Sequence, residues 1–261
     1  MEGAAGRVVL LNCFVSPFGN RVRIALARKG VVFEEKAQNL AVKSALLLSS
    51  NPVHGKVPAL LVGDKSVCES LVILEFIDDA FAGQPLLPTE PYARSQARFW
   101  ASYIDAKVRS HTHSLFTVRT ICIDRTRFLT LSRLDRKTIT WTQMPDCARR
   151  VWQSPKGSAA VEEGKNDMVA VLKTLEAELG GKSYFGGAAL GYVDVALVPF
   201  APWFATYERL AGFSVAAACP GIAAWAARCV AENPCVAASL PDAESVFQFV
   251  CGMRKHFGMI D

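Results

Sequence analysis

The sequence predicts a small α/β domain followed by a larger all-α domain. Short apolar runs of strand length alternate with stretches of helical apolar spacing over roughly the first eighty residues. A proline-rich stretch over residues 84–91 then interrupts regular structure, because its three prolines allow neither a helix nor a central strand. Beyond it, most of the chain carries apolar residues at spacings of three and four. We therefore expect an α/β domain over residues 1–83, a linker over 84–91 and an all-α domain over 92–261.

The first three elements are predicted to form one unit. Arg7–Asn12 has the composition of a short buried strand, Pro17–Lys29 has the spacing of a helix that ends at Gly30, and Val31–Glu35 is typical of a second strand. A strand, a helix and a strand within about thirty residues have the length of a right-handed crossover, which makes the two strands parallel.

A hairpin and a further helix complete the predicted α/β domain. Two apolar runs, Ala59–Val62 and Ser66–Cys68, flank the turn sequence Gly63-Asp64-Lys65, which is typical of a β-hairpin. Leu71–Phe81 then repeats apolar residues at helical spacing.

The all-α domain is predicted from four segments with apolar residues at spacings of three and four: Tyr92–Lys107, Ala159–Leu179, Val193–Ala211 and Cys219–Val230.

One segment of this domain, Val108–Gln143, differs from its surroundings. It holds eight of the eleven threonines of the chain but no alanine or glycine. Its six arginines and one lysine against two aspartates account for the whole net charge of +5. An exposed basic loop is the simplest interpretation. A nucleic-acid-binding arm is the alternative, although only three aromatic residues interleave the basic ones.

Composition excludes several classes of protein. No apolar stretch reaches the roughly 18 to 20 residues of a membrane span, and the first residues lack the basic-then-apolar plan of a signal peptide. The eight cysteines include no CxxC pair and no histidine at zinc-ligand spacing, which argues against a metal site or a disulfide framework. We therefore expect a cytosolic protein with reduced thiols, without metal and without a membrane or nucleic-acid partner.

A hydroxyl at the start of the first predicted helix is the first candidate for chemistry. Ser16 precedes Pro17, a residue favoured at the first helical position. The free N–H groups and the positive dipole end of a helix start favour a bound anion. The alternative is that Ser16 only caps its own helix, a role that stabilises a protein by roughly 1 kcal/mol.

Two further signals point to an anionic, peptide-like ligand. Glu69 and Ser70 stand at the start of the Leu71 helix and offer a second helix N-terminus. Pro58 enters the third strand, which requires a cis bond or an edge position and leaves the backbone of Val57 unpaired. An unpaired backbone next to a helix start can bind a short peptide as an added strand.

Three other features are assigned to structure rather than to chemistry. Cys13 lies at a strand end, where a packed thiol is the usual state. His54 has no acidic residue nearby in sequence to orient it. The aromatic cluster around Trp203 is more typical of a core than of a pocket.

Together these residues resemble the tau class of plant glutathione transferases. The resemblance rests on six segments in order: VSPFGNRVRIALARKG (15–30), NPVHGKVPALL (51–61), VCES (67–70), ARFWASYIDAK (97–107), DCARRVW (146–152) and GYVDVALVPF (191–200). It extends from near residue 8 to the C-terminus with one gap. The resemblance implies a thioredoxin-like N-terminal domain that binds glutathione and an all-α C-terminal domain that supplies most of the pocket for an electrophile.

The resemblance also implies roles for individual residues, each at its matching position. Ser16 matches the catalytic serine, whose hydroxyl donates a hydrogen bond to the sulfur of glutathione. The residues that match glutathione-binding positions are Lys43, Lys56, Val57, Pro58, Glu69 and Ser70. Those that match the apolar electrophile pocket are Phe18, Arg149, Trp152 and Trp203.

The chain departs from the tau-class pattern at Val108–Gln143, which interrupts what is a continuous helix in the family. Joining Lys107 to Met144 restores that helix, so we hypothesise that this insertion is translated intron sequence. A translated insertion must break this helix or extrude a loop from it, and the positions of Arg149 and Trp152 depend on which of the two occurs.

The resemblance leads us to expect a homodimeric glutathione transferase that acts on small apolar electrophiles, with additional peroxidase activity. A non-catalytic carrier inactivated by the insertion is the alternative. An interaction scaffold on the same fold is a third.

Overall fold

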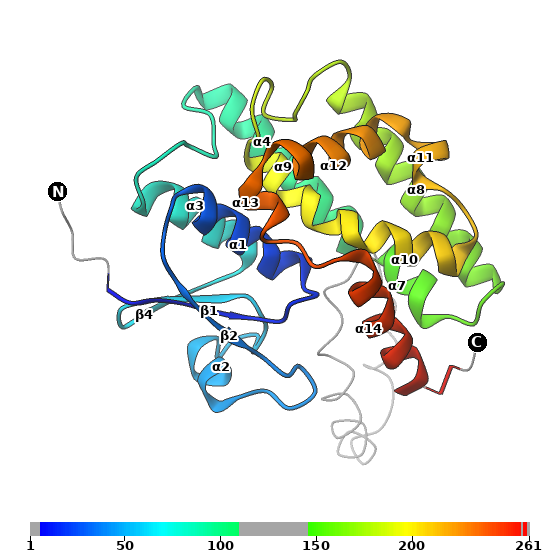
Figure 1. Ribbon diagram of the computed structural model, residues 1–261, viewed down its shortest axis with the longest axis horizontal. Coiled ribbons are helices and arrows are strands. Elements are labelled where there is room, and N and C mark those ends of the chain that lie inside the picture. Colours follow the sequence, from blue (N-terminus) through cyan, green and yellow to red (C-terminus); the bar gives the residue numbers. More distant parts are fainter. Residues whose placement is uncertain (1–5, 110–145, 257, 260–261) are drawn as a thin grey trace, which may run out of the picture.

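The computed structural model describes residues 6–109, 146–256 and 258–259. These residues form two parts, an α/β part followed by a helical part (Figure 1). The predicted insertion lies outside the described residues from position 110 onward. A four-stranded sheet and three helices are followed by a wholly helical part, and one hydrophobic core extends through both. The predicted fold class is therefore confirmed.

The sheet has the strand order β2-β1-β3-β4. Strand β1 (Val8–Asn12) pairs in parallel with β2 (Glu34–Ala37), while β3 (Ala59–Val62) is antiparallel to both β1 and β4 (Lys65–Cys68). The predicted parallel pair and the predicted hairpin are both confirmed.

The second strand begins three residues later than its predicted start at Val31. The amide N–H of Val31 donates to the carbonyl of Leu26, so this residue still belongs to the turn that ends the first helix. The strand that follows is polar and alternates between half-buried and exposed residues. Such an edge strand lacks the apolar run on which the prediction relied.

Helices cover both faces of the sheet (Figure 1). Helix α1 (Pro17–Arg28) packs against α3 (Ser70–Ala80), and the short helix α2 (Ala45–Ser50) lies beside β3 on the other side. The sequence did not reveal α2, because six residues are too few to show helical spacing.

The helical part contains elements that the sequence predicted and others that it did not. Helices α4 (Pro91–Arg109), α8 (Ala159–Leu179) and α12 (Pro220–Glu232) were predicted to within a few residues. The remaining helices of the described residues are α7 (Asp146–Gln153), α9 (Tyr192–Leu197), α10 (Ala201–Ala211), α11 (Val215–Ala218), α13 (Pro234–Ala237) and α14 (Ala243–His256).

The predicted helix Val193–Ala211 is divided into α9, a 3₁₀ turn η2 (Val198–Phe200) and α10. Pro199 and Pro202 cause the division, because each lacks the N–H that a continuing α-helix needs.

A buried ion pair holds the chain where the two parts join. The carboxylate of Asp78, at the end of α3, lies 2.8 Å from the ammonium of Lys29, and both side chains are nearly inaccessible to solvent. The same carboxylate accepts the amide N–H groups of Leu86 and Leu87, at 2.8 and 2.9 Å. The proline-rich stretch is therefore fixed to the α/β part.

None of the described helices is both long and apolar enough to cross a bilayer.

Candidate functional site

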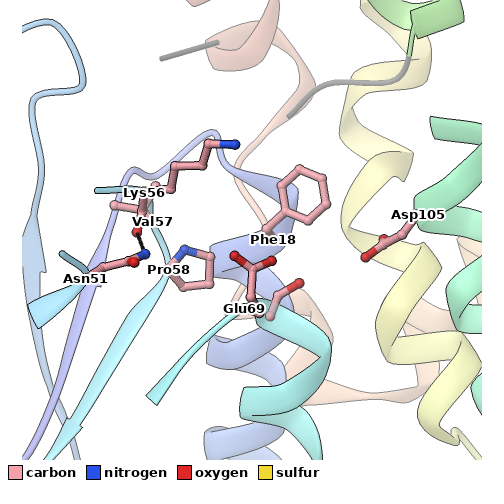
Figure 2. Close-up of a pocket in the computed structure, with 8 residues that line it drawn as sticks. Phe18, Asn51, Lys56, Val57, Pro58, Glu69 and Asp105 are labelled. Carbon is pink, nitrogen blue, oxygen red and sulfur yellow. Dashed lines mark hydrogen bonds between the residues drawn. The ribbon is translucent and has the colours of Figure 1, made fainter. Parts of the chain in front are cut away.

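A cleft lies where the α/β part meets α4 (Figure 2). Its lining comes from four places in the chain: the start of α1, the loop before β3, the start of α3 and the C-terminal part of α4. The lining residues are Phe18, Asn51, Lys56, Val57, Pro58, Glu69, Ser70 and Asp105. Six of them were singled out in the sequence: Phe18, Lys56, Val57, Pro58, Glu69 and Ser70.

The loop before β3 presents free backbone groups to the cleft. The Val57–Pro58 bond is cis. Among the described residues, neither the amide N–H nor the carbonyl of Val57 takes part in a hydrogen bond. The buried side chain of Asn51 fixes the loop, because its amide donates to the carbonyl of Lys56 at 3.0 Å and its oxygen accepts the N–H of His54 at 3.2 Å. This loop can therefore pair with an extended peptide, as its sequence indicated.

Ser16 caps α1 and is almost fully buried. Its Oγ accepts the amide N–H of Gly19 at 3.3 Å. A hydroxyl that accepts one hydrogen bond still has its own proton to donate. The capping role and the chemical role, which the sequence left as alternatives, are therefore compatible in one residue. The turn that carries Ser16 is held by Trp203, whose indole N–H donates to the carbonyl of Val15 at 3.1 Å.

The second helix start is supported by a buried arginine. Arg21, on α1, has no exposed surface and donates to Ser70 Oγ at 3.0 Å, to Asp105 Oδ1 at 2.8 Å and to the carbonyl of Ala196 at 2.8 Å. Its guanidinium also lies 5.0 Å from the ring centre of Phe18. One side chain thus fixes Ser70, Asp105 and Phe18, three of the residues that line the cleft.

Asp105 and Asn51 are site residues that the sequence analysis missed. Asp105 stands in a helical segment otherwise explained by packing, and its partner Arg21 is 84 positions away in sequence. The available sequence signal was an arginine and an aspartate on the buried faces of two amphipathic helices. No rule of residue spacing connects two residues that are so far apart in the chain.

His54 has an acidic neighbour in space, although none lies near it in sequence. Its Nε2 lies 3.8 Å from Oε1 of Glu69, and both side chains are about half exposed. The two residues are far apart in sequence and meet because the loop before β3 faces the start of α3. The assignment of Cys13 to packing agrees with its environment, since burial raises the pKa of its thiol.

Lys43 is close to this loop but does not line the cleft. Its ammonium group lies next to Gly55 of the loop, where a Cβ built on the glycine would be 3.4 Å from Nζ of Lys43.

The residues expected to form the electrophile pocket are dispersed. Phe18 lines the cleft and packs edge-on against Phe200, with ring centres 5.8 Å apart. Trp203 and Trp152 are 1% and 2% exposed and do not line the cleft. Arg149 is partly buried on α7, again away from the cleft lining.

Within the described part of the chain, no cluster of three or more His, Cys, Asp or Glu side chains could hold a metal ion.

Comparison with known proteins identifies the family. Residues 7–79 match the glutathione S-transferase N-terminal domain, and residues 158–228 match the glutathione S-transferase C-terminal domain. The chain is 44% identical to "Probable glutathione S-transferase parA" of Nicotiana tabacum, over 98% of this chain and 99% of that protein. It is 41% identical to glutathione S-transferase U25 of Arabidopsis thaliana, over 98% of each chain.

Solved structures agree with these relatives. Rice GST1, crystallised in complex with glutathione, superposes with a TM-score of 0.80 at 40% identity, over 98% of this chain and 100% of that one. A tau-class glutathione S-transferase from mango, Mangifera indica, superposes with a TM-score of 0.74 at 32% identity, over 93% and 96% of the two chains. With the thioredoxin-like sheet, the helical C-terminal part and full-length identity above 40%, the chain belongs to the tau class of the glutathione S-transferase family.

Proposed function

We propose that this glutathione transferase joins the thiolate of glutathione to small apolar electrophiles, with Ser16 as the residue that stabilises the thiolate. One observation carries the proposal: Ser16 Oγ already accepts the N–H of Gly19, so its O–H proton is free to be donated to a sulfur at the start of α1.

The cleft offers complementary groups for each part of glutathione. The unpaired backbone of Val57 can bind the cysteinyl unit as an added strand. The start of α3, with Glu69 and Ser70, suits the γ-glutamyl unit, which carries both an ammonium and a carboxylate. Lys43 and Lys56 are the cations proposed for the glycyl carboxylate. Arg21 acts through Ser70 and Asp105, and we regard it as a positioning residue.

The proposed chemistry is a nucleophilic substitution or addition. A hydrogen bond from Ser16 favours the thiolate over the thiol and lowers the pKa of glutathione. Each unit by which this pKa falls corresponds to roughly 1.4 kcal/mol. The sulfur then forms a bond to the electrophilic carbon while the leaving group departs, and the thiol proton is released to solvent. For peroxidase activity, the same thiolate would attack a peroxide oxygen and break the O–O bond, which gives an alcohol and the sulfenic acid of glutathione. A second glutathione would then convert this sulfenic acid to glutathione disulfide and water.

The electrophile is proposed to lie on the side of the cleft formed by Phe18. This ring is only partly buried and rests on Phe200, so it offers an apolar wall next to the start of α1. We propose that Trp203 contributes to the electrophile pocket indirectly, because it holds the turn that carries Ser16. The other proposed contributors to this pocket are Arg149 and Trp152.

Turnover on a model substrate tests the function. We expect the full-length protein to be retained on immobilised glutathione and to conjugate 1-chloro-2,4-dinitrobenzene, followed by absorbance. Retention without turnover would favour the non-catalytic carrier, and failure of both would favour the scaffold.

We propose a homodimer that pairs through α3 and α4. Val72 on α3 and Phe99 on α4 are 56% and 55% exposed, which is high for apolar side chains. Arg98 on α4 and Glu75 on α3 are joined by two hydrogen bonds, 3.1 and 2.6 Å, so the two helices form one surface. Light scattering on the wild type and on Phe99→Lys should give a dimer and a monomer.

We also propose a cytosolic location and the domain limits 1–83, 84–91 and 92–261. The seven cysteines of the described residues form no disulfide, which suits a reducing compartment. Limited proteolysis would test the limits, with first cleavage expected in the insertion or the linker.

A further inference from the structure

The turn that carries Ser16 joins the end of β1 to the start of α1. The N–H of Ser16 donates to the carbonyl of Cys13 at 2.8 Å, which closes a β-turn with Phe14 and Val15 at its centre. The carbonyls of these two central residues take no part in the closing bond. The orientation of each therefore depends on a partner outside the turn.

Both central carbonyls of this turn accept a hydrogen bond from a buried side chain. The indole N–H of Trp203, on α10, donates to the carbonyl of Val15 at 3.1 Å. Nδ2 of Asn20, on α1, donates to the carbonyl of Phe14, also at 3.1 Å. The peptide planes before Val15 and before Ser16 are thus each fixed by one donor.

Asn20 is an unfavourable residue for stability at its position. It lies inside α1, where asparagine is a weaker helix former than leucine or alanine. Its side chain has no exposed surface, and in the described part of the chain its Oδ1 has no hydrogen-bond partner. A buried acceptor without a partner destabilises a fold. What the side chain supplies in return is its hydrogen bond to the turn.

We propose that Asn20 is a positioning residue of the transferase reaction, which orients the turn so that the hydroxyl of Ser16 meets the sulfur of glutathione. Asn20 does not line the cleft, so it acts through the turn and not on the substrate. A misplacement of about 1 Å caused at a distance can lower a rate by about 100-fold. This inference rests on the role proposed for Ser16.

Two variants remove the donor of Asn20 and differ in size. Asn20→Leu is close in volume to the natural side chain and Asn20→Ala is smaller, and neither can donate to the carbonyl of Phe14. Each variant also removes the unpaired oxygen and favours the helix. We therefore expect both to fold, and Asn20→Leu to melt within about 3 °C of the wild type.

The pKa of the thiol of bound glutathione is the measurement that tests the proposal, followed on the full-length protein by the ultraviolet absorbance of the thiolate. Both variants should raise this pKa by about 1 and so lower kcat/KM about tenfold at pH values below the wild-type pKa. Above the pKa of every protein the thiolate is fully formed, so the deficit should disappear. Retention on immobilised glutathione should not change. A deficit of equal size at every pH would overturn the proposal.

Thr206→Val is the matched control. Thr206, on α10, is also fully buried, and among the described residues its hydroxyl oxygen has no partner. Its removal should leave the thiol pKa and the rate as in the wild type. A rise in the thiol pKa as large as in the Asn20 variants would overturn the proposal, because any change in the buried core would then have this effect.

The Ser16→Ala background separates this inference from the proposed function. If Asn20 acts through Ser16, adding Asn20→Leu to Ser16→Ala should lower kcat/KM by less than about twofold further. A wild-type rate in Ser16→Ala would overturn the proposed function and this inference with it. The inference alone is overturned if Ser16→Ala loses its rate while both Asn20 variants behave as the wild type, or if Asn20→Leu has its full effect without the hydroxyl of Ser16.

Discussion

The hydroxyl of Ser16 has two roles, one as the cap of a helix and one in the proposed reaction. As an acceptor it satisfies the N–H of Gly19. As a donor it is proposed to bind the sulfur of glutathione. These two uses predict different consequences when the oxygen is removed.

Ser16→Ala should therefore affect both catalysis and stability. We expect kcat to fall by about 100-fold, as when one donor to a developing anion is lost, with little change in retention on immobilised glutathione. Loss of the cap should lower the free energy of unfolding by about 1 kcal/mol. Steady-state kinetics and urea unfolding measure the two effects. Ser16→Thr, which keeps a hydroxyl, is the matched control, and an unchanged rate for Ser16→Ala would remove Ser16 from the mechanism.

Gly19 is required for a different reason, the close approach of α1 to β1. A Cβ at this position would lie 1.6 Å from Oδ1 of Asn12, a distance no contact allows. Asn12 cannot move away freely, because it is buried and its Nδ2 donates to Oε1 of Glu35 at 3.0 Å.

Gly19→Ala should lower the free energy of unfolding by about 2 kcal/mol, as in overpacked cores. The double variant Asn12→Ala/Gly19→Ala should lose less than the sum of the two single variants, because truncating Asn12 removes the clash. Chemical denaturation of the four proteins measures this coupling. Strict additivity would show that the clash is not what excludes a side chain at position 19.

At the scale of elements, the join between α3 and the linker depends on Asp78. Burial alone would raise the pKa of this carboxyl. The hydrogen bond from Lys29 and the N–H groups of Leu87 and Leu86 nevertheless hold it below its ordinary value. A carboxyl whose pKa is lower in the folded state stabilises the fold above its unfolded pKa, and this contribution is lost as the pH falls through the folded value.

Asp78→Asn should accordingly lower the free energy of unfolding by about 3 kcal/mol at neutral pH, because it leaves the buried Lys29 without its partner. The variant should also lose less stability than the wild type as the pH falls below about 4. Urea unfolding over a pH series measures both effects. Asp78→Asn/Lys29→Met removes both charges and should be less destabilised at neutral pH. A single variant as stable as this double one would contradict the account.

At the scale of the whole molecule, the insertion is the feature that sets this chain apart from the tau-class pattern. Its composition is foreign to the rest of the sequence, with no alanine or glycine and the whole net positive charge. The helices that border it, α4 and α7, pack against each other.

Deleting Val108–Gln143, so that Lys107 is followed by Met144, should raise the free energy of unfolding by about 2 kcal/mol, because the composition of the segment predicts a loop and closing a long loop costs entropy. Thermal and chemical unfolding of both proteins measure this, with the glutathione assay run alongside. A lower melting temperature in the deleted protein would refute the prediction. Sequencing the expressed transcript separately tests the intron hypothesis, which abundant messenger RNA encoding the segment would contradict.

The local pattern of the sequence determined most of the elements and four of the eight residues that line the cleft, namely Val57, Pro58, Glu69 and Ser70. Period and turn chemistry suffice for β1, α1, the hairpin and α8, because neighbouring residues cause these features. The signals at Ser16, Val57-Pro58 and Glu69-Ser70 were also local, since each is a helix start or a strand entry.

Only the tertiary structure decided which of these local sites meet and what holds them. The bonds from Arg21 to Ser70 and Asp105 join residues that are distant in sequence, and so does the contact between His54 and Glu69. No spacing rule reaches across such separations, because these contacts depend on how the elements pack. The proline breaks in Val193–Ala211 were visible in the sequence, yet only packing showed that Trp203 beyond them reaches back to the turn of Ser16.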